Sequence, residues 1–323
     1  MANAGDTVKV ETSGKTYGGV LMPNEETSAV VIKLSSGYNV GIAKEKVKKV
    51  EVVEKAKKVT GKKGSVSKKK GLPTISILHT GGTIASKVDY KTGGVNTHFE
   101  PEELLAMFPE LKTIANIEST FVAQMWSEDM RFAHYKLMID AVKKEIAAGV
   151  DGVIIAHGTD TMGYSLAALA FAIQESPIPI ILVGAQRSSD RGSSDAAYNL
   201  LNAAYFIAHS DFAGVAGCMH GSQDDGFGVI LPACKTRKLH SSRRDAFKVV
   251  NDEPIAKVHF KKKKISFIAS SYLAIDSKRK VVIKDKFEEK VGMIKFYPNL
   301  FPEQILSFKG FKGLVIEGTG LGQ

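Results

Sequence analysis

Two short stretches decide the fold: Thr74-Ile-Ser-Ile-Leu-His-Thr-Gly-Gly-Thr-Ile-Ala-Ser86 and Gly152-Val-Ile-Ile-Ala-His-Gly-Thr-Asp-Thr-Met162. Each begins with a short apolar run, which predicts a buried strand, and continues into glycine beside hydroxyl side chains. A strand followed by a tight glycine turn can present a hydroxyl nucleophile next to unobstructed backbone amides. Because the carboxyl ends of parallel strands meet at one edge of a sheet, we expect the two loops to converge on one pocket.

Outward from these loops, strand patterns alternate with helix patterns. We expect further buried strands at 178–183 and 214–218. Helices are predicted from Pro101 onward and at 132–147, 164–173 and 196–208. This alternation predicts an α/β fold with a parallel sheet covered by helices on both faces.

The N-terminal part of the chain has a different pattern. Within residues 5–53, apolar and polar residues alternate in four short runs separated by turn signals, which predicts a small β-barrel of the SH3-like or Sm-like kind. The next segment, 55–70, holds eight lysines and no acid, and it accounts for most of the formal net charge of +10. This segment is either a solvated linker or a flexible arm that also contacts RNA phosphates.

These patterns divide the 323-residue chain into units. We predict a small β-barrel at 1–54, a lysine-rich linker at 55–72, a catalytic domain at 73–268, an interdomain connection at 269–288 and the start of a smaller α/β domain at 289–323. The chain stops in a glycine-rich loop that directly follows an expected strand, so we expect this smaller domain to be truncated.

Composition points to a reducing, cytoplasmic setting. Cys218 and Cys234 have neither disulfide-framework nor metal-ligand spacing, and no apolar run is long enough to span a bilayer. The first residues lack the basic and apolar regions of a secretory signal.

The chemistry suggested by the two loops is nucleophilic catalysis by threonine. The spacing of the glycines fails the dinucleotide fingerprint, and no Gly-Lys-Ser/Thr follows to make a P-loop. A Gly-Gly turn by itself could also hold a phosphate or merely connect two elements. A threonine hydroxyl needs a base to take its proton, and Thr159, Asp160 and a lysine could supply that relay.

Taken together, the two loops resemble the signature loops of the bacterial-type L-asparaginase/glutaminase family, and the resemblance runs from about Pro73 to the end of the chain. Segments 123–130, 184–189, 195–202 and 237–247 are similar to other parts of that family.

The resemblance implies a role for each site residue. Thr83 is expected to attack the side-chain amide carbonyl, with Thr159, Asp160 and Lys238 as the proton relay. Tyr90 matches the tyrosine of a mobile lid that assists the nucleophile. Ser127 and Asp160 are expected to hold the charged backbone groups of the substrate, and Glu128 occupies a further substrate-binding position. No metal is implied.

Each residue also has a plainer interpretation. Thr83 could be an ordinary turn residue, Asp160 a helix N-cap, Lys238 a surface lysine and Tyr90 a lid anchor without chemistry. His157 is predicted to be a packed or hydrogen-bonded loop histidine rather than a metal ligand.

Two features favour one branch of this family. The extra β module with its lysine-rich linker is unnecessary for amide hydrolysis, and segment 240–247 resembles the D subunits of tRNA-dependent amidotransferases. That resemblance implies a glutaminase that carries no cofactor of its own. It also implies a homodimer of D subunits within a heterotetramer, and an E subunit that uses ATP and Mg to convert Glu-tRNA(Gln). We further predict that Arg243 and Arg244 couple the two sites electrostatically.

Two other function classes stay open. A free asparaginase/glutaminase would hydrolyse amides at full rate alone, and a non-catalytic RNA-binding protein with a degenerate amidase fold would bind RNA through 55–70. The choice between glutamine and asparagine is also open, since one methylene is worth only about 1–3 kcal/mol.

Overall fold

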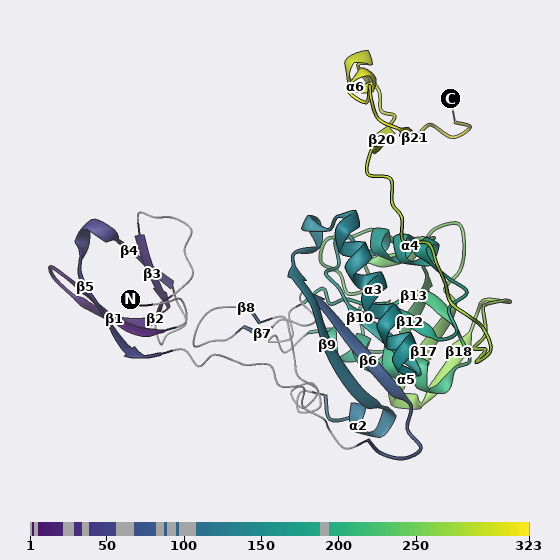
Figure 1. Ribbon diagram of the computed structural model, residues 1–323, viewed down its shortest axis with the longest axis horizontal. Coiled ribbons are helices and arrows are strands. Elements are labelled where there is room, and N and C mark those ends of the chain that lie inside the picture. The colour runs from purple at the N-terminus through teal and green to yellow at the C-terminus, as the bar shows by residue number, and fades with distance from the viewer. Residues whose placement is uncertain are drawn as a thin grey trace.

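The computed structural model describes residues 2, 6–21, 29–33, 39–55, 68–81, 87–88, 95–96, 108–187 and 194–322. Figure 1 shows a small β module, an α/β domain with a central sheet, and a short C-terminal unit. The predicted nucleophile Thr83, the lid residue Tyr90, the helix expected from Pro101 and most of the lysine-rich linker lie outside the described residues.

The N-terminal module is a five-stranded antiparallel sheet in the order β4-β3-β2-β1-β5. Its strands are β1 (Thr7–Thr12), β2 (Thr16–Leu21), β3 (Ala29–Lys33), β4 (Asn39–Ala43) and β5 (Val47–Glu54), with the short helix η1 (Lys44–Lys46) before β5. They enclose a core of Val8, Val10, Ile32 and Ile42. Among the described residues no ladder joins the two outer strands, β4 and β5.

Strand β5 was not among the four runs predicted from alternation. Its pairing with β1 shifts register between Glu11 and Thr12, so Lys48 and Lys49 are both exposed while Val50 and Val52 pack against the core. An irregularity of this kind breaks the period of two that a sequence pattern needs.

The α/β domain is built on an eight-stranded sheet in the order β18-β17-β14-β13-β12-β10-β6-β9. Five strands are parallel: β6 (Thr74–Gly81), β9 (Asn116–Met125), β10 (Gly152–Ala156), β12 (Pro179–Val183) and β13 (Gly214–His220). The remaining three pair antiparallel: β14 (Gly228–Pro232), β17 (Ala256–His259) and β18 (Lys264–Phe267). The four strands predicted from the sequence all lie in the parallel part of the sheet. The three added strands make the sheet mixed, because none of their connections contains a crossover α-helix.

Helices cover both faces of this sheet (Figure 1). They are α2 (Leu111–Ile114), α3 (Phe132–Ala148), α4 (Met162–Ala172) and α5 (Ala196–His209). Successive residues of β10 point into different cores, as the period of a strand requires: Ile154 packs with α2 and α5, and Ile155 packs with α3 and α4. Both faces of the central strands are thus buried, which explains their continuous apolar sequences.

The described residues also form shorter elements. They are β7 (Lys87–Val88) with β8 (Val95–Asn96), η3 (Ser127–Asp129), β11 (Ile173–Gln174) with β19 (Val282–Ile283), β15 (Thr236–Lys238) with β16 (Phe247–Val249), and η4 (Phe260–Lys262). The C-terminal unit has two parallel strands, β20 (Val291–Lys295) and β21 (Gly313–Glu317), connected through the helix α6 (Pro302–Leu306).

Candidate active site

The first signature stretch ends at the edge of the sheet beside the second. Thr80, near the end of β6, donates a hydrogen bond of 2.8 Å from its hydroxyl to the carbonyl of Ala156, the last residue of β10. Gly81 follows with a φ of 107°, and a Cβ there would lie 2.3 Å from the carbonyl oxygen of Met125. Only glycine fits at this position. The end of β6, which leads into Thr83, therefore lies in close contact with both β10 and β9.

Thr159, Asp160 and Lys238 meet at this edge. The Lys238 ammonium donates hydrogen bonds to the hydroxyl of Thr159 at 2.8 Å and to a carboxylate oxygen of Asp160 at 2.7 Å. The Lys238 side chain is 12% exposed, which rules out the surface-lysine interpretation. Asp160 is not a helix N-cap either, because α4 begins at Met162 after Thr161 and has no side-chain cap.

The β15–β16 hairpin delivers Lys238 to the site. Lys238 is the last residue of β15 and pairs with Phe247 of β16, whose side chain is 2% exposed. The next backbone amide, that of Leu239, donates to the carbonyl of Ala246 at 2.8 Å. The buried ring therefore fixes the hairpin on the core, and residues 239–246 form a loop at its end.

Ser127 lies on the other side of Asp160, in the turn that follows β9. Its hydroxyl donates to the second carboxylate oxygen of Asp160 at 3.5 Å, and its carbonyl accepts a 2.6 Å bond from the Thr161 hydroxyl. A Cβ on Gly158 would lie 2.7 Å from the Cβ of Ser127, so glycine is what allows the two loops to touch. Glu128, the next residue of the same turn η3, is exposed.

His157 has a structural place in the second loop. Its ring is fully buried; Nδ1 donates to the Gly158 carbonyl at 2.6 Å, and Nε2 accepts from the Ser165 hydroxyl at 2.8 Å. Burial lowers the pKa of His157 from 6.5 to about 4, so the ring is neutral at physiological pH. Within the part of the chain that the structure describes, no group of His, Cys, Asp and Glu side chains is arranged to hold a metal ion.

Gln186 belongs to the site but received no role from the sequence. Its Oε1 accepts a bond of 3.1 Å from the Thr159 hydroxyl, and its Nε2 donates to the carbonyl of Arg243 at 2.9 Å. Its backbone amide donates to both carboxylate oxygens of the buried Asp195 at 3.0 Å. An indirect signal was the polar pair Asp195 and Asn199 at the start of a largely apolar helix.

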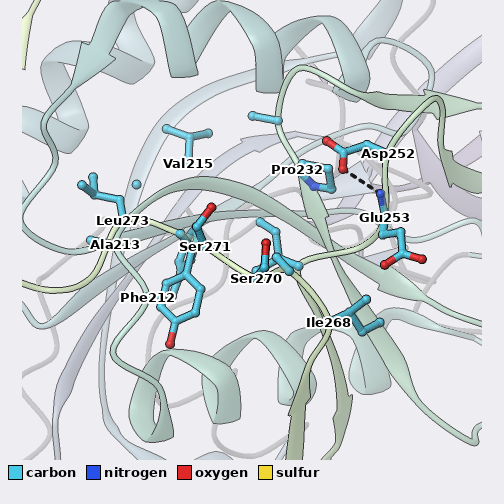
Figure 2. Close-up of a pocket in the computed structure, with 15 residues that line it drawn as sticks. Phe212, Ala213, Val215, Pro232, Asp252, Glu253, Ile268, Ser270, Ser271 and Leu273 are labelled. Atoms are coloured by element: carbon cyan, nitrogen blue, oxygen red, sulfur yellow. Dashed lines mark hydrogen bonds between the residues drawn. The ribbon is translucent and has the colours of Figure 1, made fainter.

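An open pocket lies elsewhere on the domain, where β13 begins and β14 ends (Figure 2). It has a volume of about 630 Å³ and is lined mainly by apolar side chains such as Phe212, Val215, Ile268 and Leu273. Asp252 and Glu253 lie at one side of it, where the Glu253 amide donates to Asp252. The signature loops follow the carboxyl ends of β6 and β10, so this pocket is on the opposite edge of the sheet from Lys238 and Thr159.

Comparisons with known proteins agree with this architecture. Residues 74–272 match the family model described as Asparaginase, N-terminal, and residues 2–53 match the model described as GatD N-terminal domain. Among solved structures, the thermostable L-asparaginase from Thermococcus kodakarensis superposes with a TM-score of 0.66 at 27% identity, over 77% of this chain and 72% of the other. The fold and the family match define an amidohydrolase of the asparaginase class.

Relatives that are similar in sequence identify one family within this class. The D subunit of the glutamyl-tRNA(Gln) amidotransferase of Methanococcus maripaludis is 47% identical over 98% of this chain and 77% of its own length. The protein of the same name from Pyrococcus furiosus is 48% identical over 98% of this chain and 73% of its own length. The chain belongs to the family of glutamyl-tRNA(Gln) amidotransferase D subunits. None of the described helices is long and apolar enough to cross a membrane.

Proposed function

We propose that this chain hydrolyses the side-chain amide of glutamine and that a partner subunit uses the ammonia to convert Glu-tRNA(Gln) into Gln-tRNA(Gln). The observation that carries the proposal is the contact of Thr159, Asp160 and Lys238 at the edge where β6 leads into Thr83. The likeness to D subunits over 98% of the chain, N-terminal module included, favours this role over that of a free asparaginase/glutaminase.

In the proposed reaction the Thr83 hydroxyl attacks the amide carbonyl, and its proton passes through Thr159 to Lys238, which acts in its neutral amine form. The tetrahedral adduct then expels ammonia, which takes a proton from the same relay, and water hydrolyses the ester that remains on Thr83. Backbone amides of the glycine-rich loops would stabilise the oxyanion, and one such donor typically contributes about 3 kcal/mol. Tyr90 would assist the nucleophile from its lid.

Substrate recognition is assigned to the other side of Asp160. A carboxylate that is 66% exposed and a serine hydroxyl beside it suit the α-ammonium and α-carboxylate of an amino acid. Glu128, exposed in the same turn, would supply a further contact to the substrate. The chain needs no cofactor for this step, and ATP and Mg belong to the reaction of the partner, the amidotransferase E subunit.

The test is ammonia release from glutamine and from asparagine, by the protein alone and with the E subunit, ATP and Glu-tRNA(Gln). We expect a clear excess of glutamine hydrolysis that depends on the full mixture. Full activity of the chain alone would instead identify a free asparaginase/glutaminase. Salt-sensitive RNA binding without any amide hydrolysis would support the RNA-binding class.

Two variants test the relay itself. Lys238→Arg keeps the positive charge and a donor for Asp160, but guanidinium does not give up its proton, so we expect a loss of at least about 100-fold in kcat. Thr83→Ala should abolish turnover. Lys144→Arg, on an exposed position of α3, is the matched control and should leave activity unchanged. Wild-type kcat in Lys238→Arg would refute the proposed relay.

A further inference from the structure

Gln186 bridges the relay and the loop 239–246. Its two hydrogen-bond partners determine which end of its amide is the oxygen and which is the NH₂ group. The carbonyl oxygen of Arg243 can only accept, so the group that faces it at 2.9 Å must be the NH₂ end of Gln186. The oxygen end then faces Thr159 at 3.1 Å. Because an amide oxygen also only accepts, the hydroxyl of Thr159 must donate its single proton to the hydrogen bond with Gln186.

The same hydroxyl oxygen accepts a proton from Lys238 at 2.8 Å. An ammonium has donors and no acceptor, and here one donor serves Thr159 while another serves Asp160 at 2.7 Å. A proton cannot move from Thr159 to Lys238 in this arrangement, because the ammonium has no acceptor and the hydroxyl points its proton toward Gln186. Transfer requires Lys238 in its neutral amine form and a Thr159 hydroxyl that has rotated away from Gln186.

We propose that Gln186 is an inhibitory positioning residue: it holds the hydroxyl of Thr159 in a resting orientation until the loop 239–246 moves. The proposal rests on the proposed function, and it identifies how that site is regulated. Contact of the loop with the amidotransferase partner subunit withdraws the Arg243 carbonyl. Gln186 then loses the contact that orients its amide, and the Thr159 hydroxyl is free to donate to Lys238 when that side chain is a neutral amine.

Ion pairs around Asp245 hold the loop 239–246 together next to Gln186. Asp245, 7% exposed, accepts hydrogen bonds from the guanidinium of Arg243 at 2.9 and 3.0 Å and from Lys248 at 3.0 Å. This clamp fixes the backbone of Arg243, whose carbonyl holds the Gln186 amide. The Arg243 side chain remains 46% exposed, so it is accessible to a docking partner.

A second route runs from the loop to the backbone of Gln186. Arg244 donates to Asp225 at 2.9 Å, and Asp225 contacts the buried ring of His220 at 3.3 Å. The other ring nitrogen of His220 bonds Asn199, whose amide bonds Asp195 at 3.1 Å, and Asp195 accepts the Gln186 amide. Both the side chain and the backbone of Gln186 are therefore tied to residues 243–245.

The experiment compares Gln186→Leu with wild type in glutamine hydrolysis, with and without the E subunit and Glu-tRNA(Gln). Loss of the restraining hydrogen bond should raise partner-free kcat about fivefold, equivalent to about 1 kcal/mol at about 1.36 kcal/mol per factor of ten. KM should stay within about twofold, because Gln186 does not hold the substrate. The stimulation by partner and charged tRNA should fall by the same factor as the basal rate rises.

A second variant leaves Gln186 in place. Asp245→Asn weakens the clamp on Arg243, so it should also raise partner-free kcat and reduce stimulation, and it decides the question if Gln186→Leu fails to fold. Unchanged or lower partner-free kcat in folded variants, with undiminished stimulation, would overturn the proposal. If wild type releases no ammonia under any condition and Lys238→Arg changes nothing, the proposed function itself has failed.

Discussion

Lowering the pH from 8 to 5 should destabilise the folded chain through His157, and the size of the effect follows from the burial of its ring. The imidazole is fully buried between the Gly158 carbonyl and the Ser165 hydroxyl, and its pKa falls from 6.5 to about 4. At pH 5 His157 therefore binds a proton in the unfolded chain but stays neutral in the folded chain. Stability from this group is complete above pH 6.5 and is lost as the pH falls toward 4.

The linkage relation gives the magnitude. With these two pKa values, the free energy of unfolding should fall by about 2 kcal/mol between pH 8 and pH 5 on account of His157 alone. Other groups titrate in the same range, so the quantity to measure is the difference between wild type and His157→Gln, a side chain that stays neutral throughout.

The assay is urea denaturation followed by circular dichroism at both pH values. His157→Gln should be less stable than wild type at pH 8, because glutamine replaces the ring imperfectly. That deficit should shrink by about 2 kcal/mol at pH 5. An equal loss of stability in wild type and variant would show that His157 is protonated in the folded chain without cost. The conclusion that its ring is buried and neutral would then be wrong.

Three further substitutions test the packing of the site. Gly158→Ala places a Cβ 2.7 Å from the Cβ of Ser127, so we expect it to displace Ser127 and raise KM for glutamine at least tenfold with a smaller change in kcat, measured by steady-state kinetics. Gly81→Ala combines a φ of 107° with a contact of 2.3 Å to the Met125 carbonyl, and it should cost more than about 3 kcal/mol in urea unfolding, whereas Gly71→Ala, with a positive φ but open space, should cost less. Hydrogen bonds from Arg243, followed by those from Lys248, lower the pKa of Asp245 to about 2. Its stabilising effect is thus complete above about pH 3.8 and is lost as the pH falls through 2. Since Arg243 and Lys248 are half-exposed, Asp245→Asn should cost only about 1 kcal/mol at pH 7, and this cost should vanish below pH 2.

The central strands could be predicted because both of their faces are buried. β10 and the neighbouring β12 have apolar residues at almost every position, and this pattern places them within one residue of the observed bounds. β9 was missed because it lies at the edge of the sheet, with Glu118, Ser119 and Thr120 in its middle. An edge strand buries less of its surface, so its sequence carries less of the signal.

Some residues of the candidate site could likewise be predicted from the sequence, and others could not. Thr159 and Asp160 follow a predicted strand, and the chain order alone places them at its carboxyl end. Lys238 is 78 residues away from Asp160, and nothing in the residues themselves selects it from the other lysines, so only the resemblance to a family pointed to it. Gln186 falls in segment 184–189, which resembles the family, but its role could not be predicted. Its role depends on a bond to a backbone carbonyl, and every residue type has that group.

Under the proposed function, the shared carboxylate of Asp160 links substrate binding to the proton relay. In the resting site Asp160 pairs with Lys238 at 2.7 Å, while the Asp160 side chain remains 66% exposed. Under the proposed function the α-ammonium of glutamine pairs with the same carboxylate, so it competes with Lys238 for Asp160 and leaves Lys238 free to act on Thr159. We therefore expect glutaramate, which is glutamine without its amino group, to show a lower kcat as well as a higher KM. A raised KM with kcat equal to that of glutamine would mean that Asp160 only binds the substrate and does not link binding to the relay.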